Sequence, residues 1–190
     1  SSTSNEASAA QAERVRIAVE MEALEGDTVS AIRSIVSKIL TEKGLTTNFP
    51  GFGERLFPPV SFALEDLPRV LVVSPRDRID LIDTVVLRPD ITTEDMESIE
   101  EGLARRGLSA VVDRIGGMAT YPSLVREDRS LRQAISTVAH EWLHHYLFFR
   151  PLGQRYAAGN EMTTINETFA NIVGAEIMAS HFGEDPPSFS

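Results

Sequence analysis

Two long helical patterns in the last third of the chain constrain the fold more than any other feature. They are predicted near residues 130–149 and 163–182, and a loop that contains Pro151 and Gly153 separates them. The apolar side chains of the first pattern recur on one side of the helix, at Leu131, Ile135, Val138, Trp142 and Phe149. This side is therefore buried, and two helices joined by such a loop are expected to pack antiparallel.

Three of the four histidines lie within six residues, in the segment His140-Glu141-Trp142-Leu143-His144-His145. At about 100° per residue, His140 and His144 share the face opposite the apolar stripe, one turn apart. One metal ion can therefore accept a nitrogen from each at about 2.0–2.1 Å. Glu141 lies beside the pair, where it can serve as general base in the HExxH arrangement of zinc peptidases. His145 points away from the pair and is interpreted as structural.

The absence of cysteine restricts the remaining ligands. Without thiolates, a third ligand must be His, Asp or Glu. His181 is the one remaining histidine, but Glu167 is the better candidate, because an antiparallel second helix brings it opposite the histidine pair. Asn171 lies one turn after Glu167 on the same face, and Gly174 lets the neighbouring helix approach closely. The histidine pair and Glu167 then form a His₂Glu site with a fourth position open to water, as catalytic zinc requires.

The two segments resemble the zincin metallopeptidases of the gluzincin type. The first is the HExxH helix, and the second, Ile-Asn-Glu-Thr-Phe-Ala-Asn-Ile-Val-Gly at residues 165–174, is similar to the ligand helix of thermolysin-like enzymes. The resemblance covers about residues 118–180 and implies a small sheet whose edge strand lies along the cleft. The family pattern has an aspartate four residues after the ligand glutamate, and here Asn171 holds that position. Its amide oxygen can still accept a hydrogen bond from an imidazole N–H, without adding charge.

The motif and the resemblance predict a zinc-dependent peptidase that hydrolyses peptide bonds. Zinc lowers the pKa of its water toward about 7 and polarises the scissile carbonyl, and Glu141 takes the proton and passes it to the leaving amine. A peptide or protein substrate is expected to add as a strand to residues 118–125, a predicted edge strand because Pro122 lacks an N–H. Candidates for the oxyanion donor are Tyr156, Arg155 and Tyr121.

Two other interpretations remain open. A zincin-like domain that no longer cleaves peptides and serves in binding or assembly is compatible with Asn171, although an intact Glu141 argues against it. Alternatively, the helix pair is plain scaffold with fortuitous histidines, which predicts a protein that purifies without metal. Other chemistry has little support, since the sequence contains no glycine-rich phosphate loop and no Gly-x-Ser-x-Gly nucleophile motif.

The rest of the chain predicts an α+β protein with a zincin-like arrangement of a small mixed sheet and two ligand helices. Residues 1–10 are small and polar and predict a disordered linker. Residues 11–47 predict an N-terminal helical arm, in which a second helix starts at Asp27, and residues 48–190 the metallopeptidase domain. Within that domain, strands are expected at residues 69–74, 79–87, 108–115 and 118–125, the last two joined by Gly116-Gly117, and a helix after Thr92.

The chain has a net charge of −10 and a sequence pI of about 4.9, which argues against nucleic acid or an anionic membrane as partner. No stretch reaches the roughly 20 apolar residues that a membrane span requires. The sequence begins with Ser1 rather than Met, and its first residues are rich in serine. These features lead us to expect an extracytoplasmic protein with a possible upstream anchor, of unknown oligomeric state.

Overall fold

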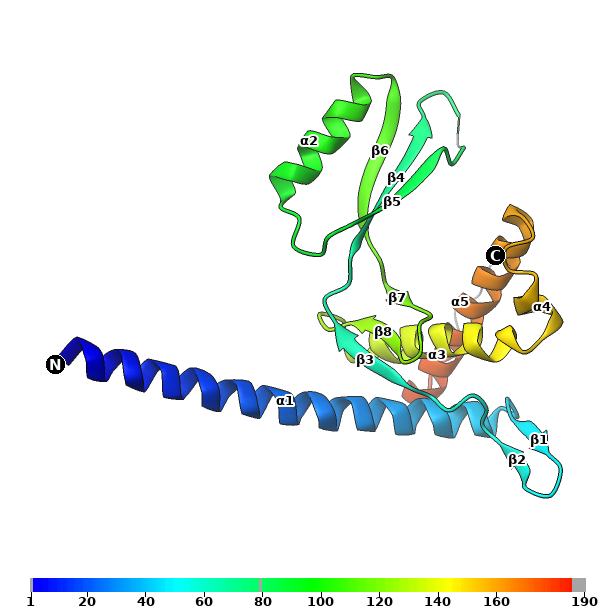
Figure 1. The fold of residues 1–190 in the computed structure, drawn as a ribbon. Helices are drawn as coiled ribbons and strands as arrows, with labels where there is room; N and C mark the ends of the chain where they lie inside the picture. Colours follow the sequence, from blue (N-terminus) through cyan, green and yellow to red (C-terminus); the bar gives the residue numbers. More distant parts are fainter. Residues whose placement is uncertain (1, 79, 186–190) are drawn as a thin grey trace.

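The computed structural model describes residues 2–78 and 80–185, with side chains from residue 10 onward. It is an α+β protein, which confirms the expected class. Figure 1 shows a long helix α1, a body that contains α3, α5 and a small sheet, and a lobe built from β4, β5, β6 and α2. None of the described helices is both long and apolar enough to cross a membrane.

Helix α1 (Ser2–Glu42) is continuous, whereas the sequence predicts a linker over residues 1–10 and a new helix at Asp27. Ser1 lies outside the described residues. Alanine and glutamate favour helix, and extending a helix costs less free energy than nucleating another one. Residues 10–28 are exposed and extend away from the body (Figure 1). The last turns of α1 are anchored in the core by Ile32, Val36, Ile39 and Leu40.

The sheet of the body has the strand order β3-β8-β7. Its strands are β3 (Phe62–Glu65), β7 (Gly117–Met118) and β8 (Ser123–Arg126). β8 pairs with β3 in parallel and with β7 antiparallel, so β7 is an edge strand and β8 is central. The predicted single edge strand over residues 118–125 is therefore wrong, because the chain turns at residues 119–122, where Pro122 cannot donate to a ladder. Gly116 and Gly117 are not a hairpin turn, since they lead from the lobe into β7.

The lobe is inserted in the chain between β3 and β7. Its antiparallel sheet, in the order β5-β4-β6, consists of β4 (Arg69–Pro75), β5 (Asp83–Leu87) and β6 (Leu108–Arg114). Helix α2 (Thr93–Ala104) packs against β6, and its N-cap Thr92 accepts a hydrogen bond from the Asp95 N–H, as predicted. β5 is shorter than the strand predicted over residues 79–87, whose first residue, Ile79, lies outside the described residues.

The last third of the chain forms the two predicted long helices. They are α3 (Leu131–Phe148) and α5 (Asn160–Phe182), joined through the short α4 (Pro151–Gln154). Ser130 and Gln133 form a capping box that fixes the start of α3. Gly174 lies where α5 crosses α3, and an added Cβ would be 2.6 Å from the Ser136 carbonyl oxygen. Only glycine allows the two helices to approach this closely.

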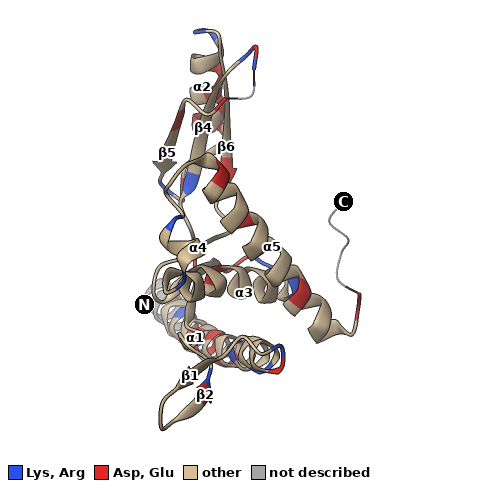
Figure 2. Cartoon of the chain, turned by 90° about the vertical axis from the view of Figure 1, so that its right-hand side faces the viewer, with Lys and Arg blue, Asp and Glu red and all other residues tan. Residues whose placement is uncertain are grey.

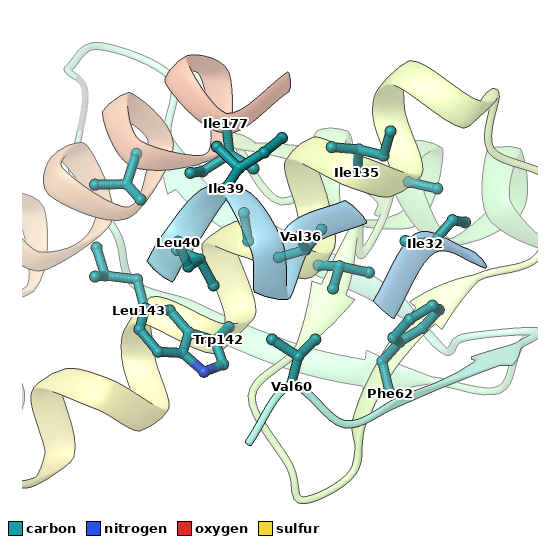
Figure 3. Close-up of a cluster of buried hydrophobic side chains, with 14 of the residues drawn as sticks. Ile32, Val36, Ile39, Leu40, Val60, Phe62, Ile135, Trp142, Leu143 and Ile177 are labelled. Atoms are coloured by element: carbon teal, nitrogen blue, oxygen red, sulfur yellow. The ribbon is translucent and has the colours of Figure 1, made fainter. Parts of the chain in front are cut away.

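The core fills the space between α1, α3 and α5. In Figure 3 the side chains of these helices converge with those of Val60 and Phe62, which precede and begin β3. The Trp142 indole N–H donates a hydrogen bond of 2.7 Å to the Pro58 carbonyl oxygen, so this buried polar atom has a partner. A small hairpin of β1 (Thr47–Phe49) and β2 (Gly53–Arg55) follows α1, in a region where the sequence analysis expects no strand.

Candidate metal centre

His140 and His144 project from the same face of α3, one turn apart. Their Nε2 atoms lie 3.1 Å from each other, and the side chains are 18% and 13% exposed. Burial of Trp142 and its neighbours fixes the opposite face of α3, so the helix has little freedom to rotate. The spacing predicted from the sequence is thus found on a rigid element, which is what a metal site requires.

Glu167 of α5 faces the histidine pair. Its Oε2 lies 3.3 Å from Nε2 of His140, and its Oε1 lies 3.4 Å from Nε2 of His144. The close crossing at Gly174, one to two turns further along α5, lets the carboxylate reach this position. The third ligand candidate inferred from the sequence is therefore brought to the two histidines.

These three distances allow a test of whether one metal ion fits. A tetrahedral ion with bonds of about 2.0–2.1 Å holds its ligand atoms about 3.3–3.4 Å apart. The Nε2 atoms of the two histidines lie 3.1 Å apart, and they lie 3.3 and 3.4 Å from two different carboxylate oxygens of Glu167. Each separation is close to that between two ligand atoms of one tetrahedral ion, and the donor set is that of catalytic zinc sites.

Glu141 lies next to the candidate ligands and is 6% exposed. The ligand atoms of His140, Glu141 and His144 all lie within 4.8 Å of one another. Burial, and after it repulsion from Glu167, raises the pKa of Glu141 to about 8. A cation held by the neighbouring ligands would favour the ionised form of this carboxyl.

The electrostatics of the two histidines favour the neutral rings that bind metals. Burial lowers the pKa of His140 and of His144, although the negative charge of Glu167 opposes the shift in both. Asn171 is close enough to hydrogen-bond to His140 and also acts to raise the pKa of that ring. The position predicted to orient a ligand histidine therefore contacts one.

Tyr156 follows α4 and points at Glu167, the third candidate ligand. Its hydroxyl donates a hydrogen bond of 2.6 Å to Oε1 of Glu167. Burial, followed by the hydrogen bond and the charge of Glu167, raises the pKa of Tyr156 to about 12. The phenol therefore keeps its proton at neutral pH and can donate to an oxyanion.

The other residues singled out in the sequence are placed less centrally. Tyr121 lies on the cleft wall, where its ring packs edge-to-face on His145 with centroids 5.4 Å apart. Arg155 is absent from the part of the cleft wall that the structure describes. His181 packs against Phe182 in the last turn of α5 and does not join the ligand group.

A cleft of about 1220 Å³ opens over these groups. One wall carries Gly116 and Gly117 at the edge strand, and the floor carries the histidines and Glu141 of α3. Another part of the wall is largely apolar and is formed by Phe57, Pro58, Pro59, Tyr121, Phe148 and Phe149. The site is thus a groove large enough for several residues of an extended peptide.

Asn166 is a cleft residue that the sequence analysis did not identify. It is fully buried, and its Nδ2 donates to the carbonyl oxygens of Leu152 at 3.2 Å and of Met162 at 2.8 Å. It therefore ties α4 to the first turns of α5, next to Glu167. An asparagine directly before the ligand glutamate was visible in the sequence, but its contact with the α4 backbone depends on the fold.

Comparison of the chain with protein-family models, with curated proteins and with solved structures finds no match.

Proposed function

We propose that this chain is a zinc-dependent peptidase of the gluzincin type. His140, His144 and Glu167 would hold the ion, and Glu141 would act as general base. The observation that carries the proposal is the close approach of these three side chains beside a buried glutamate. The histidine Nε2 atoms lie 3.1 Å apart and lie 3.3 and 3.4 Å from the two carboxylate oxygens of Glu167. Metal ligands without a neighbouring base would support metal binding alone.

Zinc is favoured by the chemistry of the donor set. Two imidazole nitrogens and one carboxylate suit zinc, whereas calcium and magnesium prefer six or more oxygen ligands. When bound, the ion supplies Lewis acidity, which lowers the pKa of water toward about 7 and polarises a carbonyl oxygen.

Glu141 would accept a proton from the attacking water and return it to the leaving amine. Its carboxylate is held between α3 and the backbone of Gly117, so it has little freedom to move. Tyr156 would donate a hydrogen bond to the oxyanion that develops as the carbonyl is attacked. Its hydroxyl already reaches the ligand group, since it lies 2.6 Å from Glu167.

The substrate would bind beside β7, as an added strand. β7 pairs only with β8 in the described sheet, so its other edge can form backbone hydrogen bonds with an extended peptide. The glycines at its start present no side chain to obstruct this edge. The combination of a parallel pair, an antiparallel edge strand and two ligand helices supports a zincin-like fold as part of the same proposal.

Peptide cleavage by the zinc-loaded full chain tests this function. We expect wild-type protein to cleave members of a broad peptide library, as measured by mass spectrometry. Glu141→Gln should retain zinc and lose at least about 100-fold in rate, because general acid–base catalysis contributes about 10²–10⁴-fold. The matched control is Glu101→Gln, which makes the same change on the exposed face of α2.

Equal rates in wild type and Glu141→Gln would contradict the proposed mechanism. Stoichiometric zinc without any cleavage by wild type would instead favour the binding or assembly domain that Asn171 leaves open.

A further inference from the structure

Four arginines gather where the lobe joins the body. Arg69 and Arg114 are directly opposite each other across β4 and β6, although like charges in such a pair repel. Arg126 lies at the end of β8, and Arg129 just before α3. Among the described residues, Asp128 is the one carboxylate within 4.0 Å of any of the four guanidinium groups. The cluster therefore carries a surplus of positive charge.

The four members of this arginine cluster differ in their hydrogen-bond partners. Arg114 and Arg126 both bond to Asp128. The Nε atoms of Arg69 and Arg129, in contrast, are buried and have no hydrogen-bond partner among the described residues. A buried guanidinium donor without an acceptor is costly, so such a group is usually paired with an anion.

Arg129 lies against a residue of the cleft wall, although it does not itself line the cleft. Its Nη2 lies 3.1 Å from the position that a Cβ of Gly116 would occupy, and Gly116 is part of the cleft wall. A Cβ on the next residue, Gly117, would instead overlap Glu141 of α3. Because successive residues of an extended segment face opposite sides, Arg129 lies on the face of the edge strand turned away from α3.

This placement determines what Arg129 would meet in a bound peptide. Paired residues on neighbouring strands project their side chains to the same face of a sheet. A substrate strand added to β7 would therefore direct the side chain opposite Gly116 toward Arg129. A carboxylate there would accept charge-assisted hydrogen bonds from the guanidinium group.

We propose that Arg129 binds a carboxylate of the substrate, so that the enzyme selects peptides with an acidic residue close to the cleaved bond. This inference rests on the proposed peptidase function. The net charge of −10 makes the cluster more significant, because the rest of the protein repels acidic peptides. The arginine cluster is a local surplus of positive charge that would attract them.

Binding of matched peptides tests the proposal independently of catalysis. The probes are fluorescein-labelled octapeptides with amidated C-termini, each carrying Glu at one position, and the same peptides with Gln. Anisotropy with zinc-loaded Glu141→Gln protein measures binding without cleavage. We expect one position at which Glu binds on the order of tenfold more tightly than Gln. A second set of these peptides has free C-termini, so that binding of a terminal carboxylate can be told apart from binding of a side-chain carboxylate. A site for the terminal group would show the preference only at the last residue.

Variants of the arginine cluster test whether Arg129 causes the preference for Glu over Gln. In Arg129→Gln the Glu/Gln ratio should fall to near one, whereas Arg105→Gln, the same change on an exposed residue of α2, should keep it. Asp128→Asn, also at an exposed position, should raise the ratio, because it frees Arg114 and Arg126. The proposal is overturned if no position prefers Glu, or if the preference survives in Arg129→Gln. If wild type binds Glu peptides selectively but cleaves none, the peptidase function fails while the carboxylate site stands.

Discussion

Gly117 and Glu141 are in direct contact: a Cβ at position 117 would overlap the carboxylate of Glu141. The edge strand β7 thus passes over the residue that we propose as general base. The strand defines one wall of the cleft and also limits where the carboxylate can lie. Substrate binding and proton transfer would therefore depend on the same short piece of backbone.

Gly117→Ala tests this relationship. The added methyl group must displace Glu141 or β7, and displacement of a catalytic group by about 1 Å can cost on the order of 100-fold in rate. We expect peptide cleavage to fall by that order while zinc content stays unchanged. Gly102→Ala in α2 is the control, since its nearest contact is an arginine side chain at an ordinary 3.8 Å. Cleavage at the wild-type rate in Gly117→Ala would show that the contact is unimportant.

Asn171→Asp should strengthen metal binding. Asn171 is close to His140, and a carboxylate in its place adds negative charge that raises the basicity of the ring. Changes at such supporting positions typically alter metal affinity by about 10–100-fold, so we expect a gain of about tenfold. Competition with a chelating dye measures it. Asn160→Asp, at the first residue of α5, is the matched control, and an equal gain there would argue for a general charge effect.

Gly174→Ala should both destabilise the protein and weaken the metal site. A Cβ 2.6 Å from the Ser136 carbonyl oxygen forces α3 and α5 apart, and overpacking of this kind costs about 1–3 kcal/mol. Urea unfolding in the presence of chelator measures the free energy, and dye competition measures zinc affinity. Gly26→Ala, with open space around it in exposed α1, should be neutral or stabilising by up to about 1 kcal/mol. The same effect in both variants would contradict the close crossing.

Tyr156→Phe should reduce turnover and leave zinc bound. The variant removes the hydroxyl that lies 2.6 Å from Glu167, and the loss of one oxyanion donor costs about 10²–10³-fold in kcat. Steady-state kinetics with a cleaved library peptide measures the effect. Tyr146→Phe on α3, whose ring stacks on Trp142, is the control for loss of a phenol. Full activity of Tyr156→Phe would remove Tyr156 from the mechanism.

Local periodicity explains which parts of the site could be predicted. His140 and His144 are one helical turn apart, so their common face follows from the sequence alone. Glu167 required one further step, the antiparallel packing of two helices, and the structure brings it to both histidines. The contacts of Gly117 with Glu141 and of Asn166 with Leu152 join distant parts of the chain, and no periodic pattern encodes them.

The sheets show the same limit. The branched residues of β4 were sufficient to predict it, whereas β3 is a four-residue strand that directly follows a proline-rich segment and gives no comparable signal. The sequence predicts one strand over residues 118–125 where the structure has β7 and β8, because both strands are short and only the pairing register separates them. The small polar residues at the start of the chain predict a linker, whereas the structure has one continuous helix α1 there. Alanine and glutamate, which favour helix, outweigh the polar residues.

Metal content measured by elemental analysis tests the central claim most directly. We predict that the purified full chain, loaded with zinc and freed of excess metal, retains one zinc ion per chain. His144→Ala and Glu167→Gln should each lose most of it, whereas His181→Ala, at the end of α5, should keep it. Wild type without bound zinc, or His144→Ala with the wild-type amount, would contradict the metal centre.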